Sequence, residues 1–327
     1  MNEPPVPSLT ASTVPRGALT RFAPAPTGWL HLGHVLNALH VWAAARENDG
    51  RVLLRIEDHD RDRSRTEYEV GILDDLDWLG FHPDVFPTAA FRAGPCDGRQ
   101  SDRELVYRGA VGILQSQGLV YACDCSRARI ADEGRNGSEL RYSGHCRERH
   151  LPFADGYGWR VRMDEGTEIF DDVRLGRQEQ DPFEQCGDLL IRDRRGNWTY
   201  QFAVTVDDWR QEIDLVVRGI DLLASTGRQL RLARLRLLGR ECPPVFLHDR
   251  LIMKSSGTLQ HPSAPFSTPQ HPSAPLSTLQ HPSAPFSTPQ HPSAPFQKLS
   301  KSDGDTGVRD LRAKGWSAAQ VIAAARG

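Results

Sequence analysis

Two histidines three residues apart, His31 and His34, follow the turn-forming run Pro-Thr-Gly and stand where a helix is predicted to begin. A helix amino terminus presents unpaired N–H groups and the positive end of its dipole, which suit nucleotide phosphates. Imidazole N–H groups there can stabilise charge that develops on a phosphate, so we predict a catalytic role for both histidines. The alternative is a pair of partly exposed histidines without a role. The predicted nucleotide-binding residues in this segment are Pro26, Thr27, Gly28 and Gly33.

A second phosphate-binding segment is predicted near the carboxyl end, at Lys298-Leu299-Ser300-Lys301-Ser302. Lysine is scarce in this chain, and Lys301 could bring a mobile positive charge to the β- and γ-phosphates. Such a run alone is more often a solvated loop, so its interpretation depends on the histidine segment. Lys254-Ser255-Ser256 is a weaker alternative, because only the later run leads directly into a helical pattern. The predicted nucleotide-binding residues here are Lys298, Ser300 and Lys301, with Lys301 also catalytic.

Three of the six cysteines lie close together in the sequence, at Cys123, Cys125 and Cys146. Thiolates suit Zn²⁺, and a structural zinc site takes four ligands. Chemistry alone would favour His145 as the fourth ligand. Three reduced cysteines without a metal are the alternative. The scattered positions of the other cysteines do not fit a disulfide framework.

The histidine segment lies inside a predicted strand–loop–helix–strand unit. Residues 20–23 are expected to form a strand, 33–47 a helix with apolar residues at helical spacing, and 51–56 a second strand. Glu57 directly follows that second strand. Ligands of parallel sheets bind beyond the carboxyl ends of the strands, so we expect both the histidine loop and Glu57 at one sheet edge.

The remaining pattern predicts an α/β protein whose parallel sheet is interrupted by an inserted domain. Helices are expected at 68–79, 103–117, 225–238 and 308–313, and strands at 200–206 and 215–218. The predicted organisation is a tail at 1–19, two halves of a Rossmann-type catalytic domain at 20–106 and 200–250, an insertion with the zinc site at 107–199, and a small helical subdomain at 251–327.

A ten-residue repeat interrupts that last subdomain. Gln-His-Pro-Ser-Ala-Pro recurs from Gln260, Gln270, Gln280 and Gln290. Its prolines exclude a helix or central strand, and its few large apolar residues cannot build a solenoid. We therefore predict that residues 258–296 are a disordered insertion, either without function or used to dock a partner. Residues 1–19 are predicted to be a disordered tail.

Charge and hydropathy exclude several classes of protein. The formal charge of −2 over 327 residues is no overall nucleic-acid signature, so RNA contacts would need a local patch. The amino end lacks the pattern of a secretory signal, and no run approaches the roughly 18 apolar residues of a membrane helix. We expect a cytoplasmic monomer. Four arginines near the cysteines could contact phosphates or form a solvated basic face: Arg127, Arg129, Arg147 and Arg149.

Taken together, the two phosphate-binding segments resemble the nucleotide-binding signatures of class I aminoacyl-tRNA synthetases. Further segments resemble the glutamyl and glutaminyl group of that family: Arg21 to Gly28, Arg55-Ile56-Glu57-Asp58, Gln100-Ser101-Asp102-Arg103, Tyr200-Gln201-Phe202-Ala203 with Asp207-Asp208, and Val217-Arg218-Gly219 with Asp221-Leu222. Only residues 303–327 follow the second signature, fewer than an anticodon-binding domain needs. That feature and the cysteine pattern are similar to the glutamyl-Q tRNA(Asp) synthetases, a truncated branch of the group.

The resemblance implies a glutamate site and a zinc site. Family positions matching Arg21 and Arg218 hold the carboxylates of glutamate, the position of Glu57 faces the α-ammonium, and that of Tyr200 hydrogen-bonds the substrate. A bidentate guanidinium is also the best physical match for a carboxylate. Tyr142 is implied as the fourth zinc ligand, with His145 kept as the alternative. The full set implied for glutamate is Arg21, Phe22, Ala23, Pro24, Ala25, Glu57, Tyr200 and Arg218.

The implied activity is ATP-dependent formation of glutamyl-adenylate, with Mg²⁺ on the phosphates, and transfer of glutamate to the queuosine base of tRNA(Asp). No protein nucleophile is needed, so catalysis would come from positioning and electrostatics. Two alternatives stay open. The first is charging of a tRNA 3′ end with the help of a partner, and the second is a non-catalytic synthetase-like binding protein.

Overall fold

The computed structural model describes residues 14–133, 135–136, 139–234, 243–249 and 307–326. The second phosphate-binding segment, with Lys298, Ser300 and Lys301, lies outside these residues, as do Lys254 and the repeats. The described part is an α/β structure built on a mixed sheet of six strands in the order β2-β1-β10-β11-β7-β8. Its strands are β1 (Leu19–Phe22), β2 (Arg51–Leu54), β7 (Glu168–Asp172), β8 (Gly176–Gln180), β10 (Leu215–Gly219) and β11 (Val245–Asp249).

Five neighbouring strands of this sheet are parallel, and β8 closes the edge as an antiparallel hairpin with β7. Phe22 pairs with Leu54 at the ends of β1 and β2, and Arg218 pairs with His248 at the ends of β10 and β11. The carboxyl ends of four strands therefore meet at one edge, as the sequence predicted for β1 and β2. This edge is where ligands of parallel sheets bind.

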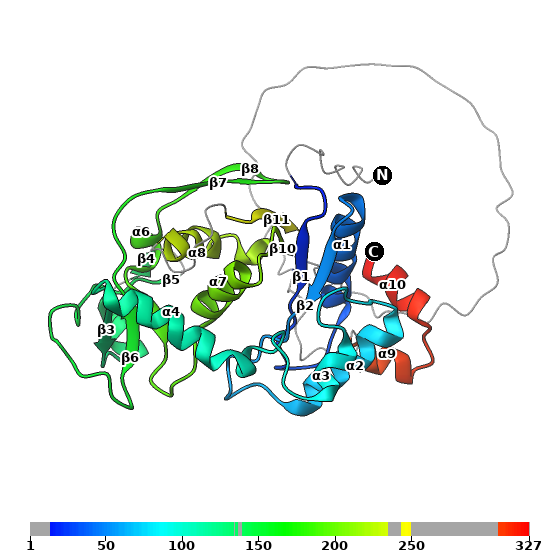
Figure 1. The fold of residues 1–327 in the computed structure, drawn as a ribbon, viewed down its shortest axis with the longest axis horizontal. Coiled ribbons are helices and arrows are strands. Elements are labelled where there is room, and N and C mark those ends of the chain that lie inside the picture. The colour runs from blue at the N-terminus through cyan, green and yellow to red at the C-terminus, as the bar shows by residue number, and fades with distance from the viewer. Residues whose placement is uncertain (1–13, 134, 137–138, 235–242, 250–306, 327) are drawn as a thin grey trace, which may run out of the picture.

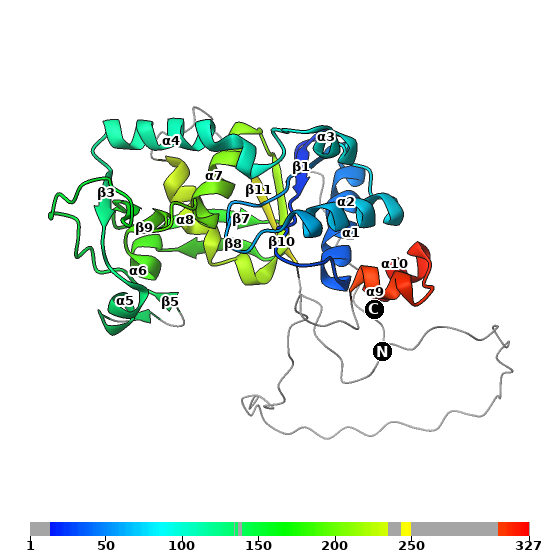
Figure 2. The ribbon, with the colours of Figure 1, turned by 90° about the horizontal axis from the view of Figure 1, so that it is seen from below.

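Helices cover both faces of the sheet, with α1 on one face and α7 and α8 on the other (Figures 1 and 2). One core packs around α1 and α2, and a second packs around α4, α7 and α8. The helices of this part are α1 (Leu32–Glu47), α2 (Thr66–Leu79), α3 (Thr88–Ala93), α4 (Glu104–Ser116), α7 (Tyr200–Arg210) and α8 (Ser225–Arg234), with 3-10 turns at Gln100–Arg103 and Ile220–Leu222. None of the described helices combines the length and apolar composition needed to cross a membrane.

A smaller lobe lies at the far end of α4, around a three-stranded antiparallel sheet in the order β3-β6-β9 (Figure 1). It carries the clustered cysteines. The predicted insertion at 107–199 differs from the structure at one point: β7 and β8 lie within that range but belong to the main sheet. The elements of the lobe are β3 (Val120–Cys123), α5 (Arg127–Glu133), β4 (Arg135–Asn136), β5 (Glu139–Leu140), β6 (Gly158–Val161), α6 (Pro182–Cys186) and β9 (Leu189–Arg192).

The strand predicted at 200–206 is wrong, because these residues begin helix α7 (Tyr200–Arg210). The run is rich in β-branched and aromatic residues, which favour strands. Every residue from Phe202 to Trp209 is buried, so the helix has no polar face that would reveal its period. Tertiary burial outweighs local propensity at this position.

The tail predicted at residues 1–19 extends too far, because its last residues belong to the fold. Val14 and Ala18 are buried in the main core, and Gly17 donates a backbone hydrogen bond to Asn48. The structure thus includes residues 14–19 in the fold, with Leu19 opening β1.

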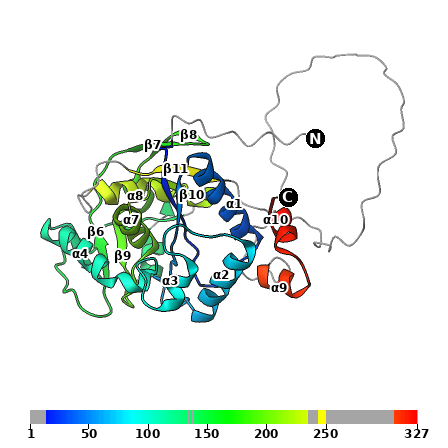
Figure 3. The same cartoon turned by 45° about the vertical axis from the view of Figure 1, so that its right-hand side comes forward.

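Two short helices from the carboxyl end, α9 (Val308–Ala313) and α10 (Ala318–Arg326), pack against α1 and α2 (Figure 3). The bounds of α9 match the predicted helix. The segment just before α9 is fixed to the histidine region, because Gly307 forms a β-bridge with His31 and the Val308 N–H donates to the Leu30 carbonyl at 2.9 Å. The segment that precedes α9 therefore meets the segment that precedes α1.

Candidate active site

The loop between β1 and α1 is tied to the end of β2. The Glu57 N–H donates to the Pro24 carbonyl, and the Arg65 N–H donates to the Pro26 carbonyl, both at 3.0 Å. Phe22, which precedes this loop, is buried against Trp42 of α1, so its side chain supports the core. The predicted residues from Ala23 to Gly28 thus form a fixed turn between the strand edge and the helix.

His31 and His34 lie at the start of α1, as predicted, and cap it with their side chains. Nδ1 of His31 accepts from the Gly33 N–H at 3.0 Å, and Nδ1 of His34 accepts from the His31 N–H at 3.1 Å. A neutral imidazole that accepts at Nδ1 carries its hydrogen on Nε2. Both rings, whose centroids are 3.9 Å apart, are therefore set as Nε2–H donors at a helix amino terminus.

Gly33 has a steric role that the sequence argument missed. A Cβ at this position would come within 2.8 Å of Cε1 of His31. A side chain here would displace the His31 ring from its capping position. Residue 33 must therefore be glycine for the His31 ring to reach the Gly33 N–H. This holds whether or not Gly33 also lies close to a nucleotide.

Two of the predicted glutamate-binding residues are buried arginines with different partners. Arg21 donates to Asp208 at 3.2 Å and to the Val217 carbonyl. Arg218 donates only to neutral acceptors: Nε2 of His248 at 3.0 Å, and Gln229 Oε1 and Thr226 Oγ1 at 2.8 Å. Among the described residues, no carboxylate lies at ion-pair distance from Arg218.

Arg218 is consequently a buried cation that its surroundings do not neutralise. Burial and the nearby charge of Arg21 lower its pKa, although Tyr200 and Asp208 oppose this. His248 stays neutral beside it: burial and Arg218 hold the pKa of His248 below its usual value, despite the hydrogen bond between its Nδ1 and Asp172. A buried guanidinium with only neutral partners is costly unless a ligand supplies the anion.

Glu57 lies three residues beyond the end of β2 and is only 6% exposed. Burial raises its pKa, while Arg55, His59 and Arg21 act in the opposite direction. Arg55 itself is engaged with Asp208 at 2.8 Å. An arriving ammonium group would favour the Glu57 carboxylate, which is the chemistry predicted for this position.

Tyr200, the first residue of α7, completes the predicted set. Its hydroxyl lies within the electrostatic influence of Arg218, Glu57 and Arg21. Burial, with Glu57 and Asp208 nearby, raises the pKa of the phenol, so it remains a hydroxyl at neutral pH. The structure therefore brings Arg21, Glu57, Tyr200 and Arg218 together from four elements far apart in the sequence.

A buried carboxylate beside this group was missed as a site residue, although the motif that contains it was noted. Asp207 is fully buried and accepts at 2.8 Å from Arg103, Tyr107 and Gln100. Gln100 in turn contacts His59, whose Nδ1 is 2.7 Å from Gln100 Oε1. No spacing rule would have joined these residues, because they come from three separate segments.

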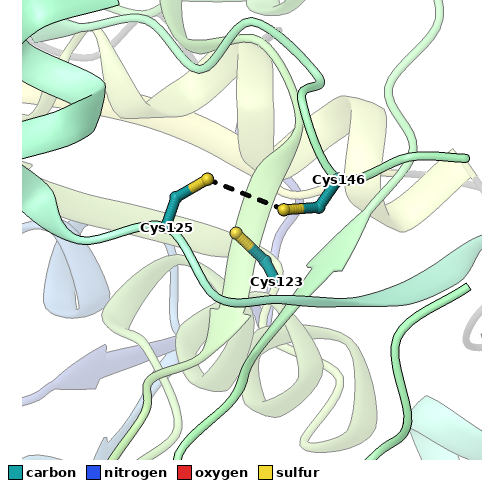
Figure 4. Close-up of side chains that lie close together, drawn as sticks. All are labelled: Cys123, Cys125 and Cys146. Carbon is teal, nitrogen blue, oxygen red and sulfur yellow. Dashed lines mark hydrogen bonds between the residues drawn. The ribbon is translucent and has the colours of Figure 1, made fainter. Parts of the chain in front are cut away.

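The three clustered cysteines converge in the small lobe, as predicted (Figure 4). Their sulfurs all lie within 4.8 Å of one another, and all three residues are buried. The Tyr142 hydroxyl oxygen is 3.5 Å from Sγ of Cys123 and accepts from the Cys146 N–H at 2.8 Å. The donor set of three sulfurs and one oxygen fits a closed zinc site.

Electrostatics around the cluster favour thiolate at one sulfur. Burial opposes ionisation of Cys123, but Tyr142 and Arg160 outweigh it and lower the pKa of this thiol. Arg160 donates to Cys123 Sγ at 3.3 Å. The pKa of Cys125 is raised to about 12 by burial and by the neighbouring sulfurs, as expected for crowded thiols without a cation.

The alternative ligand His145 is not part of this group. It is exposed, and its ring contacts Arg129 at 2.9 Å. Arg147 and Arg149, suggested as RNA contacts, form ion pairs with Asp188 and Asp124. These two arginines therefore have ion-pair partners within the lobe, and the choice between RNA contact and solvated face stays a prediction.

A cavity of about 950 Å³ runs from the cysteine cluster to Tyr200. Arginines from several elements line it together with the acidic Asp188 and Asp193. Its volume far exceeds that of an amino acid and admits a group of nucleotide size. The lining arginines are Arg127, Arg160, Arg194, Arg195 and Arg228.

Comparison with known proteins gives a consistent picture. Residues 18–259 match the family described as "tRNA synthetases class I (E and Q), catalytic domain". A "Glutamyl-Q tRNA(Asp) synthetase" of Cupriavidus metallidurans is 42% identical over 247 residues, covering 72% of this chain and 74% of the relative. "Glutamate--tRNA ligase 2" of Syntrophus aciditrophicus is 38% identical over 258 residues, covering 76% of this chain but 51% of the relative.

Solved structures agree with the sequence relatives. The glutamate-tRNA synthetase of Elizabethkingia anophelis matches with a TM-score of 0.62 and 28% identity, over 74% of this chain and 52% of that protein. A glutamate tRNA ligase of Elizabethkingia meningosepticum, solved "in complex with its amino acid", matches with a TM-score of 0.61 and 27% identity, over 75% of this chain and 52% of that protein. The chain thus spans about half the length of these solved synthetases.

Proposed function

Because the chain belongs to the class I tRNA synthetases (E and Q), a family of ligases, we propose that it activates L-glutamate with ATP and transfers the glutamyl group to the queuosine base of tRNA(Asp). In the first step, a glutamate carboxylate oxygen attacks the α-phosphate of ATP and pyrophosphate leaves. The acyl-adenylate then reacts with a hydroxyl of the queuosine cyclopentene ring, and AMP leaves.

The observation that carries the glutamate assignment is the charge imbalance at Arg21 and Arg218. Arg21 shares the Asp208 carboxylate with Arg55, and Arg218 has only neutral partners among the described residues. A dicarboxylate would supply the missing negative charge, and Glu57 would receive the ammonium. Tyr200 would hydrogen-bond the same ligand.

ATP would lie at the start of α1. The Nε2–H groups of His31 and His34 would donate to phosphate oxygens, where the helix dipole adds to their effect. Mg²⁺ would neutralise the phosphates when ATP binds. Lys301 lies outside the described residues, and its role at the phosphates stays a prediction from sequence.

The choice of acceptor rests on the relatives. Those named for the queuosine reaction are matched over 70% to 75% of their length, whereas the glutamate–tRNA ligases are matched over about half. Ordinary 3′-end charging is the second candidate, because those ligases are also 36% to 38% identical to this chain.

Cys123, Cys125, Cys146 and Tyr142 would hold one structural Zn²⁺. The ion would fix the β3 end of the lobe and leave no open position for catalysis. A cytoplasmic, monomeric enzyme remains the prediction from sequence.

The test is glutamate-dependent ATP–pyrophosphate exchange, followed by transfer of labelled glutamate to tRNA(Asp) with and without queuosine. We expect exchange in the absence of tRNA and transfer only to the queuosine-bearing tRNA. Equal transfer to both tRNAs would favour 3′-end charging. No exchange under any condition would favour the binding-protein alternative.

A further inference from the structure

His59 is a half-buried histidine beside the glutamate site that none of the roles above uses. It follows β2 in a loop that is fixed on both sides. The Ser101 N–H donates to Asp58 at 2.8 Å, and the Gln100 N–H donates to the Ile56 carbonyl at 3.1 Å. The position of the His59 ring is therefore set by the surrounding backbone.

The hydrogen bonds determine which ring nitrogen carries the hydrogen. Gln100 is 1% exposed, and its amide contacts Asp207 on one side and His59 on the other. A carboxylate only accepts, so the Gln100 nitrogen must face Asp207 and its oxygen must face His59. Nδ1 of His59 therefore donates to Gln100, and Nε2 of the neutral ring is left with a lone pair.

In His59 the hydrogen is on the opposite ring nitrogen from that in His31 and His34. Those rings accept at Nδ1 and present Nε2–H donors, as phosphate binding requires. His59 donates at Nδ1 and presents a proton acceptor. A base held by a buried partner that is itself oriented by a carboxylate is a recurrent catalytic arrangement.

The acceptor lies close to where the acyl group would react. His59 is two residues from Glu57 in the chain, and its ring centroid is 6.0 Å from that of Tyr200. Tyr200 also lines the large cavity. If Glu57 holds the α-ammonium, the activated α-carbonyl carbon is only two bonds from that nitrogen.

We infer that His59 is the general base of the transfer step, which rests on the proposed function. The acceptor hydroxyl oxygen forms a bond to the carbonyl carbon of glutamyl-adenylate as its proton passes to Nε2 of His59. The bond between that carbon and the phosphate oxygen breaks, and AMP leaves with the electron pair. Asp207 and Gln100 act as positioning residues for the base.

The test separates activation from transfer. Wild type, His59→Gln and His59→Ala are loaded with glutamyl-adenylate, and single-turnover transfer to queuosine-bearing tRNA(Asp) is measured beside ATP–pyrophosphate exchange. We expect transfer to fall about 100-fold, the lower range for general-base catalysis, and exchange to fall far less. Added imidazole should partly restore transfer by His59→Ala, which a structural defect would not allow. The exposed His82→Gln is the control variant.

The outcomes distinguish this inference from the proposed function. If His59→Gln transfers glutamate at the wild-type rate, the inference about His59 is wrong, while the proposed function still stands. A rise in the glutamate KM during exchange, with transfer unchanged, also overturns it and makes His59 a glutamate-positioning residue. Wild-type protein that activates glutamate but transfers it to no tRNA overturns the transfer function, and the role of His59 with it.

Discussion

The proposed glutamate site is built on charges that are buried in the free protein. Arg21, Glu57 and Arg218 are each at most 6% exposed. Burial of an unpaired charge costs free energy, so a residue such as Arg218 reduces stability in the free protein. In the proposed site the same cost would give selectivity, because only a ligand with matching carboxylates would recover it.

Replacing Arg218 with lysine tests this argument at one residue. A lysine is a point charge and cannot hold His248, Thr226 and Gln229 while also presenting two parallel N–H groups to a carboxylate. We expect Arg218→Lys to raise the glutamate KM in pyrophosphate exchange by about 10- to 100-fold, with little change in the KM for ATP.

Arg177→Lys is the matched control, because Arg177 is an exposed arginine of β8 that pairs with Glu179. The charge argument for Arg218 does not hold if both variants have the same glutamate KM. It also fails if the KM for ATP changes as much as that for glutamate.

At the scale of elements, the cysteine end of the small lobe has a small core of its own. The three strands of the lobe are short, and the core around the cysteines contains only six buried residues among those described: Tyr121, Cys123, Cys125, Ile130, Tyr142 and Cys146. The strands of the lobe also contribute Val120, Val161, Leu189 and Ile191 to the larger core around α4, α7 and α8, so it is the cysteine end that has little core of its own. A metal that ties β3 to the loop at Cys146 would add to the stability of that end.

Tyr142→Phe should weaken zinc binding, because it removes the only oxygen of the proposed ligand set. We expect a purified wild-type chain to carry one zinc, and the variant to release it to a chelator about 10-fold faster or more. Zinc content by elemental analysis and chelator-dependent release are the measurements. His145→Ala is the control. Loss of zinc from His145→Ala, with full retention in Tyr142→Phe, would reverse the ligand assignment.

The contrast between α1 and α7 shows which elements a sequence can reveal. Helix α1 has a turn before it, a capping histidine pair and apolar residues on one face, so its position was predicted within one residue. Helix α7 is buried almost throughout, and its composition favours a strand. When every side of a helix is buried, its polar and apolar residues do not alternate with the helical period, so the sequence pattern cannot reveal the helix.

At the scale of the whole molecule, the carboxyl-terminal helices close over a buried acid of α2. Asp75 is 4% exposed, and its Oδ2 has no hydrogen-bond partner among the described residues. Arg309 and Arg312 of α9 act on it but stack on Trp29 and Trp78. Burial raises the pKa of Asp75 to about 7; the nearby Asp74 acts in the same direction, while Arg312 and Arg309 oppose it.

This pKa predicts how stability depends on pH. Unfolding returns Asp75 to an ordinary pKa of about 4, so the folded state binds the proton more tightly. The stability contribution is complete below about pH 4, decreases as pH rises towards 7, and is absent above that value. We expect Asp75→Asn to raise the melting temperature at pH 8 relative to wild type and to flatten its dependence between pH 5 and 8.

The measurement is thermal unfolding of both proteins across that range, with the exposed Asp155→Asn as control. The stabilisation at pH 8 should be on the order of 1 to 3 kcal/mol, since a substituted amide recovers only part of the shift. A variant as pH-dependent as wild type would show that Asp75 is not the responsible group.

The sequence by itself determined the features that depend on neighbouring residues. The strand–turn–helix unit with His31 and His34, the close spacing of Cys123 and Cys125, and the helix at 308–313 are all encoded within short segments. Turn formation, helix capping and the spacing of metal ligands act over a few residues, so their patterns can be read directly.

Only the tertiary structure decided the features that join distant segments. Asp208 neutralises Arg21, His248 and Gln229 hold Arg218, and Gln100 orients His59, yet these partners are separated by up to 187 residues. Sheet order, burial and hydrogen-bond direction exist only once the chain has folded. These features decide that Arg218 lacks an anionic partner among the described residues and that Nε2 of His59 keeps a lone pair. Both outcomes depend on contacts between residues far apart in the sequence.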